Sequence, residues 1–207
     1  MTPVSHNLLW LLLDDDTGRP LLDRATTGRA LTVAAVADIA CGAPRQHGRS
    51  LSSRQRRERS LATLHSTRCV RRDSIRMGGV VPRTVWPTVD LPGKQALRRA
   101  LERALFDAQQ PDRPTRALIA ILHAADVLAV QFPRWPQHET GYWAGQFIVR
   151  HSDCAELAES LRRLDREALA DALGFGARPL FVPRTPPGPQ PVSPVGHRAR
   201  AGRSTAE

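Results

Sequence analysis

An almost uninterrupted apolar stretch in the second half of the chain decides the fold. Residues 115–130 read Thr-Arg-Ala-Leu-Ile-Ala-Ile-Leu-His-Ala-Ala-Asp-Val-Leu-Ala-Val. A helix with this sequence carries apolar side chains on most of its faces, so it must be surrounded by protein. The stretch therefore predicts a central core helix over Thr115–Val130. A chain of 207 residues is long enough to bury it.

Other segments show the 3.6-residue periodicity of helices that pack one face against such a core. The clearest is 94–107, where Leu97, Leu101 and Leu105 fall on one side and arginines lie away from them. Further helices are expected over about 26–40, 54–68 and 153–173. Residues 8–13 are expected to form a first helix or another buried segment.

The remaining segments predict turns, a hairpin and a tail. Residues 69–72 and 75–81, separated by Asp73 and Ser74, predict a short β-hairpin with its turn at those two residues. Residues 43–53 are expected to form a linker, and residues 132–147, which contain prolines and aromatic residues, an irregular connection. We expect one helical domain over 1–177 and a disordered, basic, proline-rich tail over 178–207.

Positive charge is concentrated in the middle of the chain. The formal net charge is +10, and residues 44–86 hold eleven arginines against two acidic residues. Such an excess predicts attraction to a polyanion, either nucleic acid or an anionic membrane surface. The charge alone does not choose between these two partners.

Catalytic, metal and membrane-spanning functions find little support in the sequence. Three widely spaced cysteines argue against a disulfide framework and for a reducing, cytoplasmic environment. The seven histidines and three cysteines lack metal-ligand spacing, so we expect no metal and no cofactor. His123 and Asp126 share a face of the predicted core helix, but without a nucleophile motif an ordinary core histidine is favoured. The apolar run 8–13 is too short to cross a bilayer, so membrane contact must be peripheral.

Two arginines have a spacing suited to phosphate. Arg54 and Arg57 lie one turn apart at the start of a predicted helix, roughly 4.5 Å along its axis. Two guanidinium groups at that separation can donate charge-assisted hydrogen bonds to one phosphate group. By composition alone, a solvated basic helix end remains the more common outcome.

Several stretches resemble the Golgi phosphoprotein 3 family, in its actinobacterial form. They are Leu11–Leu21, Arg83–Asp90, the 94–107 helix and Ala117–Leu128, of which the last is the most specific. The resemblance implies an all-α fold, a helical bundle with outer amphipathic helices and one short β-hairpin. It also implies a non-enzymatic function, because eukaryotic members bind phosphatidylinositol 4-phosphate peripherally at membranes.

The resemblance also assigns roles to particular arginines. Residues 54–59, Arg-Gln-Arg-Arg-Glu-Arg, resemble the family's Arg-x-x-Arg-Glu-Arg segment, whose first and fourth positions bind the lipid headgroup. This implies that Arg54 and Arg57 bind a headgroup. The hairpin 69–81 resembles the family's membrane-proximal and self-association hairpin. Its membrane-contacting residues would be Arg71, Arg72 and Arg76.

The chain departs from the family pattern at three places. Asp23 stands where the family's pocket has a tryptophan, and Thr32 stands where it has a basic residue, although Arg29 is nearly one turn away. The family also has a long helical segment before the Arg-x-x-Arg helix, and here only the linker 41–53 fills that gap. A complete phosphatidylinositol 4-phosphate pocket therefore does not carry over.

The sequence thus predicts a cytoplasmic, peripheral membrane protein whose partners are anionic lipids. Self-association through the hairpin is an open alternative, as is decay of the shortened chain into a family member without binding activity. Nonspecific nucleic-acid binding is a further alternative. It is less favoured, because residues 45–83 contain no Trp, Phe or Tyr on which bases could stack.

Overall fold

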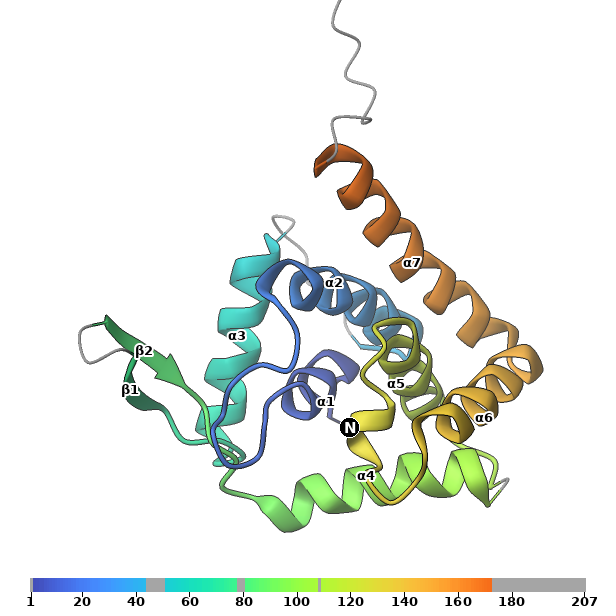
Figure 1. The fold of residues 1–207 in the computed structure, drawn as a ribbon, viewed down its shortest axis with the longest axis horizontal. Helices are drawn as coiled ribbons and strands as arrows, with labels where there is room; N and C mark the ends of the chain where they lie inside the picture. Colours follow the sequence, from blue (N-terminus) through green and yellow to red (C-terminus); the bar gives the residue numbers. More distant parts are fainter. Residues whose placement is uncertain (1, 44–50, 78–80, 108, 173–207) are drawn as a thin grey trace, which may run out of the picture.

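The fold is a bundle of helices from which one hairpin projects (Figure 1). The computed structural model describes residues 2–43, 51–77, 81–107 and 109–172. Its helices are α1 (Val4–Leu11), α2 (Arg24–Ala40), α3 (Ser53–Ser66), α4 (Leu91–Phe106), α5 (Arg113–Ala124), α6 (Gln137–Arg150) and α7 (Ser152–Ala172), with a short 3-10 turn, η1 (Ala129–Gln131). The strands are β1 (Asp73–Met77) and β2 (Val81–Val85). The expected all-α class with one hairpin is confirmed, whereas the tail predicted over 178–207 and most of the linker lie outside the described residues.

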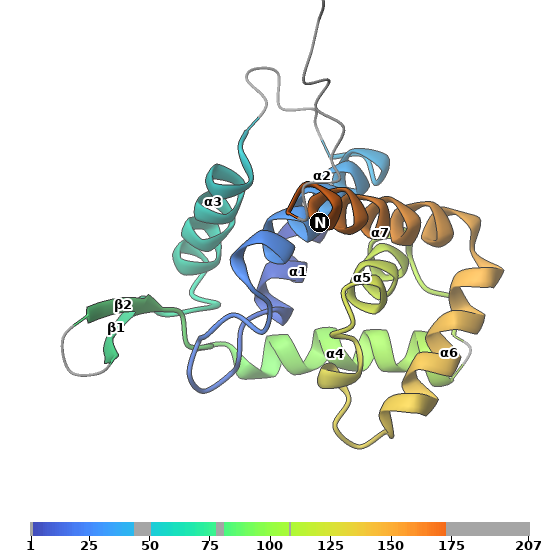
Figure 2. The same ribbon diagram turned by 45° about the horizontal axis from the view of Figure 1, so that its top comes forward.

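Helix α5 occupies the centre of the bundle. It packs against α1, α2, α4, α6 and α7, and the two ribbon views show these helices around it (Figures 1 and 2). Every residue from Ala117 to Leu122 is buried. A helix that is apolar on most of its faces must be buried in this way, because it has no polar face to present to water.

The core helix ends six residues earlier than predicted. Asp126 adopts a left-handed backbone conformation with φ 56°, and the Val127 amide donates to the Leu122 carbonyl at 3.0 Å. This closes the helix at Ala124 and returns Val127 and its neighbour to the core. The turn also means that His123 and Asp126 do not share a helical face, so the geometry considered for a catalytic pair is absent.

Helix α6 was missed in the sequence, where its residues were expected to be irregular. Its buried face is formed by Thr140, Ala144, Phe147 and Ile148, which have helical spacing. Two of these side chains are small, and prolines and glycines surround them, so the pattern is hard to distinguish from a loop. The helix begins directly after Pro136. At this position the missing amide hydrogen removes no hydrogen bond of the helix.

The hairpin exists, but its turn lies elsewhere. Strands β1 and β2 pair antiparallel, with Asp73 opposite Val85 and Met77 opposite Val81. The predicted turn at Asp73 and Ser74 is therefore wrong, since both residues lie in β1. The predicted hairpin ended at residue 81, whereas β2 begins there and includes Pro82. A two-stranded ribbon has only edge strands, where a proline is tolerated.

A buried charge network fastens the N-terminal turn to α4. The ammonium group of Lys94 is fully buried and lies 2.7 Å from Asp15 Oδ1 and 2.5 Å from the Leu13 carbonyl. Arg98 donates to both carboxylate oxygens of Asp15, at 2.6 and 3.2 Å, and to Gln131. Burial raises the pKa of Asp15, but the hydrogen bonds from Arg98 and Lys94 outweigh it and the pKa is lowered.

The same turn holds the segment that follows the hairpin. The Trp86 amide donates to the Gly18 carbonyl at 3.1 Å, and the Thr88 amide donates to the Asp15 carbonyl at 3.1 Å. Gly18 has φ 63°, and a Cβ there would lie 2.2 Å from the Pro87 nitrogen. Only glycine fits this crossing. None of the described helices has the length and apolarity that crossing a membrane demands.

Replacing Asp15 by asparagine tests the buried network. We expect Asp15→Asn to lower the free energy of unfolding by about 3 kcal/mol, because it leaves the buried Lys94 charge without its counter-ion. Asp16→Asn, at the exposed neighbouring position, should change it by no more than about 0.5 kcal/mol. Urea denaturation of the three proteins measures both effects.

The pH dependence follows from the lowered pKa of Asp15. A lowered pKa means that the carboxylate stabilises the folded state above about pH 4 and loses this effect as the pH falls through the folded-state pKa. The difference between wild type and Asp15→Asn should therefore be full at neutral pH and shrink in acid. A difference that stays constant down to pH 2 would contradict the role given to Asp15.

Candidate anion-binding pocket

An arginine-rich pocket opens where α2, α3 and β2 meet. Its volume is about 630 Å³, and four arginines line it: Arg24, Arg54, Arg57 and Arg83. We call it the arginine pocket. The rest of its wall is formed by Pro20, Leu21, Leu22, Asp23, Thr27, Glu58 and Thr84. Figure 1 shows the start of α2, the start of α3 and the hairpin on one side of the bundle.

Two helices begin beside this pocket. Asp23 caps α2, since its carboxylate accepts hydrogen bonds from the amides of Ala25 and Thr26 at 2.7 and 3.0 Å. Ser52 and Gln55 form a capping box that starts α3. The two starts are packed closely, because a Cβ on Gly28 would lie 3.0 Å from the Cβ of Ser53. Both helix dipoles therefore direct positive potential toward this region.

The two arginines predicted from the sequence both line the arginine pocket, but their surroundings differ. Arg54 is exposed and donates through Nε to Glu58 at 2.8 Å, a bond that raises the pKa of Arg54. Arg57 is half-buried. Its burial and then the nearby charge of Arg24 lower the pKa of Arg57. The carboxylate of Glu58 opposes this shift, and Arg83 adds a weaker lowering effect. Arg57 is therefore a desolvated cation among like charges.

Arg24 and Arg83 were not singled out in the sequence. Arg24 is the first residue of α2, and Arg83 lies in β2. Among the described residues, neither side chain takes part in a hydrogen bond or ion pair. The placement of Arg83 depends on the hairpin register, which was predicted incorrectly. The spacing of residues along the sequence does not indicate that Arg24 or Arg83 lies beside Arg57.

The positions where the chain departs from the family pattern add no positive charge to the arginine pocket. Asp23 borders the arginine pocket, and hydrogen bonds from Thr26 lower its pKa, so its negative charge remains. Arg29 donates to Asp165 of α7 and to the Thr26 hydroxyl at 2.9 Å, so it is engaged away from the pocket. The Thr32 hydroxyl donates to the Gly28 carbonyl at 3.0 Å.

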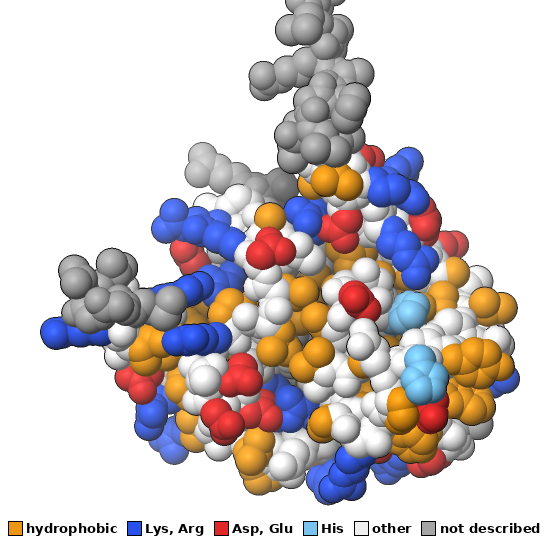
Figure 3. Space-filling view, in the orientation of Figure 1, with side chains coloured by type: hydrophobic (Ala, Val, Ile, Leu, Met, Phe, Trp, Pro, Cys, Tyr) orange, Lys and Arg blue, Asp and Glu red, His pale blue; other side chains and the backbone are white. Residues whose placement is uncertain are grey.

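The three hairpin arginines named from the sequence are exposed and do not line the arginine pocket. Arg71 and Arg72 precede β1, and Arg76 lies within it. Arg71 donates to Asp73 at 3.2 Å. Figure 3 shows Lys and Arg side chains gathered over the hairpin and α3. These residues can therefore add attraction to an extended anionic surface beside the pocket.

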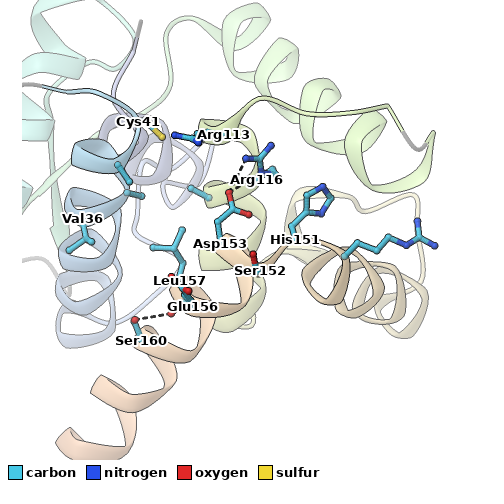
Figure 4. Close-up of a pocket in the computed structure, with 14 residues that line it drawn as sticks. Val36, Cys41, Arg113, Arg116, His151, Ser152, Asp153, Glu156, Leu157 and Ser160 are labelled. Carbon is cyan, nitrogen blue, oxygen red and sulfur yellow. Dashed lines mark hydrogen bonds and ion pairs between the residues drawn. The ribbon is translucent and has the colours of Figure 1, made fainter.

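A second pocket of similar volume lies between the end of α2 and the starts of α5 and α7 (Figure 4). It also contains arginines, but Arg116 donates to Asp153 through two nitrogens, at 3.0 and 2.9 Å. Glu156 adds a second negative charge to the wall. Cys41 lies beside Arg113, and burial raises the pKa of its thiol. This pocket holds less uncompensated positive charge, so the arginine pocket is the stronger candidate for an anion.

In the part of the chain that the structure describes, no group of side chains is arranged to bind a metal ion. Nowhere in these residues do three or more His, Cys, Asp or Glu side chains gather so that they could hold an ion.

Comparison with known proteins agrees with the resemblance seen in the sequence. A sequence model of the family described as Golgi phosphoprotein 3 (GPP34) matches residues 45–173, more than half of the chain. The matched region includes Arg54, Arg57 and the hairpin, whereas Asp23 and Arg24 precede it. No curated protein matches this chain.

Asp23 offers a test of the electrostatics of the arginine pocket. Asparagine is as good an N-cap as aspartate, so Asp23→Asn should keep α2 capped while removing a negative charge from the pocket wall. We expect affinity for inorganic phosphate to rise, by up to about fivefold, with little change in stability. Calorimetric titration and thermal melts measure the two quantities.

Asp23→Ala separates the cap from the charge. It removes the same charge but also the cap, and should lower the free energy of unfolding by about 1 kcal/mol. Unchanged phosphate affinity in both variants would show that Asp23 does not influence the arginine pocket.

Proposed function

Because this chain belongs to the Golgi phosphoprotein 3 family, we propose that it is a non-enzymatic protein that docks peripherally on membranes by binding anionic phospholipid headgroups. The arginine pocket would receive the headgroup, with Arg54 and Arg57 as donors. The exposed hairpin arginines Arg71, Arg72 and Arg76 would contact the surrounding lipid surface. The proposed location is the cytoplasmic face of a membrane.

The observation that carries this proposal is the cluster of like charges around Arg57. Its guanidinium group is half-buried and close to the cations of Arg24 and Arg83. Such an arrangement is unfavourable until an anion enters, and the anion then gains charge-assisted hydrogen bonds. Each bond to a charged group contributes about 1.5–3 kcal/mol. Two such bonds would contribute about 3–6 kcal/mol to the binding of a phosphate in the pocket.

The hairpin would supply a second, less specific contribution. A basic side chain near an anionic membrane surface contributes about 1 kcal/mol. Arg71, Arg72 and Arg76 together would then contribute about 3 kcal/mol, less where Asp73 partly neutralises Arg71. The pocket would select the headgroup, and the hairpin would raise the affinity for any anionic bilayer.

By resemblance, the specific ligand proposed is phosphatidylinositol 4-phosphate. Its phosphomonoester carries a charge of about −1.5 to −2 at neutral pH, more than a phosphodiester carries. That charge suits a pocket with several arginines better than a singly charged headgroup does. The altered positions Asp23 and Thr32 mean that affinity must come from residues of this chain, not from a complete family pocket.

Liposome flotation of a double variant tests the named arginines. We expect Arg54→Ala/Arg57→Ala to bind vesicles containing phosphatidylinositol 4-phosphate at least tenfold more weakly than wild type, because one lost charge-assisted bond already corresponds to about that factor. Arg162→Ala/Arg163→Ala is the matched control. It removes the same charge from α7, away from the arginine pocket, and should bind nearly as wild type does.

The outcomes separate the alternatives. Equal flotation of the two double variants would show that the named site is wrong. Steeply salt-dependent DNA binding without lipid preference would support a nucleic-acid binder instead. Absence of all binding with a broad, non-cooperative melt would indicate a decayed family member.

A further inference from the structure

We infer that Arg24 of α2 and Arg83 of β2 hold the headgroup phosphate together with Arg57, so that the hairpin forms one wall of the binding site. This inference rests on the proposed function and names the residues that complete its pocket. It also makes Arg54 a secondary contributor. These roles follow from the residues that line the arginine pocket of this chain.

The hairpin register places Arg83 on the side that faces the bundle. Arg83 pairs with Ile75, and Val85, two residues further along β2, is buried. Because side chains alternate along a strand, Arg83 shares the face of Val85. Arg76 pairs with Pro82 and lies on the opposite face. The lining of the arginine pocket agrees with this, since it includes Arg83 and not Arg76.

The charge balance of the arginine pocket identifies the arginines that remain available. Arg54 is bonded to Glu58, so this pair is close to neutral. Arg24, Arg57 and Arg83 have no ion pair with any described residue, and Asp23 is the other carboxylate of the wall. Three positive charges and one negative charge leave an excess of about two. A phosphomonoester dianion matches that excess, and a phosphodiester monoanion does not.

A buried hydroxyl group supplies an independent indication of a ligand. Thr27 lines the arginine pocket one turn after Asp23 and is only 1% exposed. Its Oγ1 has no hydrogen-bond partner in the part of the chain that the structure describes. Leaving such a group unpaired costs about 1–3 kcal/mol. A phosphate oxygen held by Arg24 and Arg57 would accept its hydrogen bond.

Calorimetric titration with the deacylated headgroup, glycerophosphoinositol 4-phosphate, tests the assignment without a membrane. We expect Arg83→Ala and Arg24→Ala each to weaken binding about tenfold, as Arg57→Ala does. Arg162→Ala removes the same charge from the exposed surface of α7, away from the arginine pocket, and should stay within twofold of wild type. Arg54→Ala should have a smaller effect than Arg57→Ala.

Thr27→Val keeps the shape of the side chain and removes the hydroxyl. We expect it to weaken headgroup binding severalfold while the protein remains at least as stable, because an unpaired buried hydroxyl is lost. A titration with inorganic phosphate distinguishes the source of the phosphate. Binding as tight as that of the headgroup would mean that the pocket takes free phosphate and not a lipid.

The results distinguish failure of this inference from failure of the proposed function. If Arg57→Ala loses headgroup affinity while Arg83→Ala and Arg24→Ala behave like Arg162→Ala, the pocket is real but these two arginines do not complete it. If neither wild type nor any variant binds the headgroup, both proposals are overturned. Urea denaturation midpoints check that each variant is folded. We expect them to equal that of wild type, because Arg24, Arg83 and Arg162 are all exposed.

Discussion

The position of the arginine pocket depends on the buried ion pair between Lys94 and Asp15. A fully buried ammonium group needs its counter-ion, so α4 and the N-terminal turn must stay together. The N-terminal turn also accepts hydrogen bonds from the amides of Trp86 and Thr88, which lie in the segment that follows β2. Arg83 is three residues before Trp86. The root of the hairpin, and with it Arg83, is therefore fixed by a charge pair in the core.

The arginine pocket itself works against stability. Three cations without ion pairs, one of them half-buried, repel one another in the absence of an anion, and the core must offset this cost. The burial of α5 and the Lys94 network supply that stability at a distance from the pocket. Binding and stability thus reside in different parts of the fold. In the second pocket the charges are compensated within the protein. Asp153 neutralises Arg116 there, so little attraction for an anion remains.

The features that were predictable from the sequence are those that depend on local periodicity. The apolar stretch around Ala117–Leu122 required a central helix, and the spacing of Arg54 and Arg57 placed both on one pocket. Helix α6 was missed because two of its four buried side chains are small and prolines and glycines surround them. The hairpin register was missed because Asp73 and Ser74, residue types common in turns, were taken as its turn, although both lie in β1. Arg24 and Arg83 could not be found, since only tertiary packing brings them to Arg57.

The packing of α2 against α3 determines how the pocket is built. The starts of these helices pack directly, Gly28 against Ser53. This brings Arg24, at the first position of α2, to the side of Arg57 on the first turns of α3. The tryptophan expected by resemblance is replaced by Asp23, whose carboxylate caps α2. The arginine pocket concentrates positive charge even without the tryptophan and the basic residue that the resemblance implies, because helix starts and a hairpin strand bring arginines from three separate parts of the sequence.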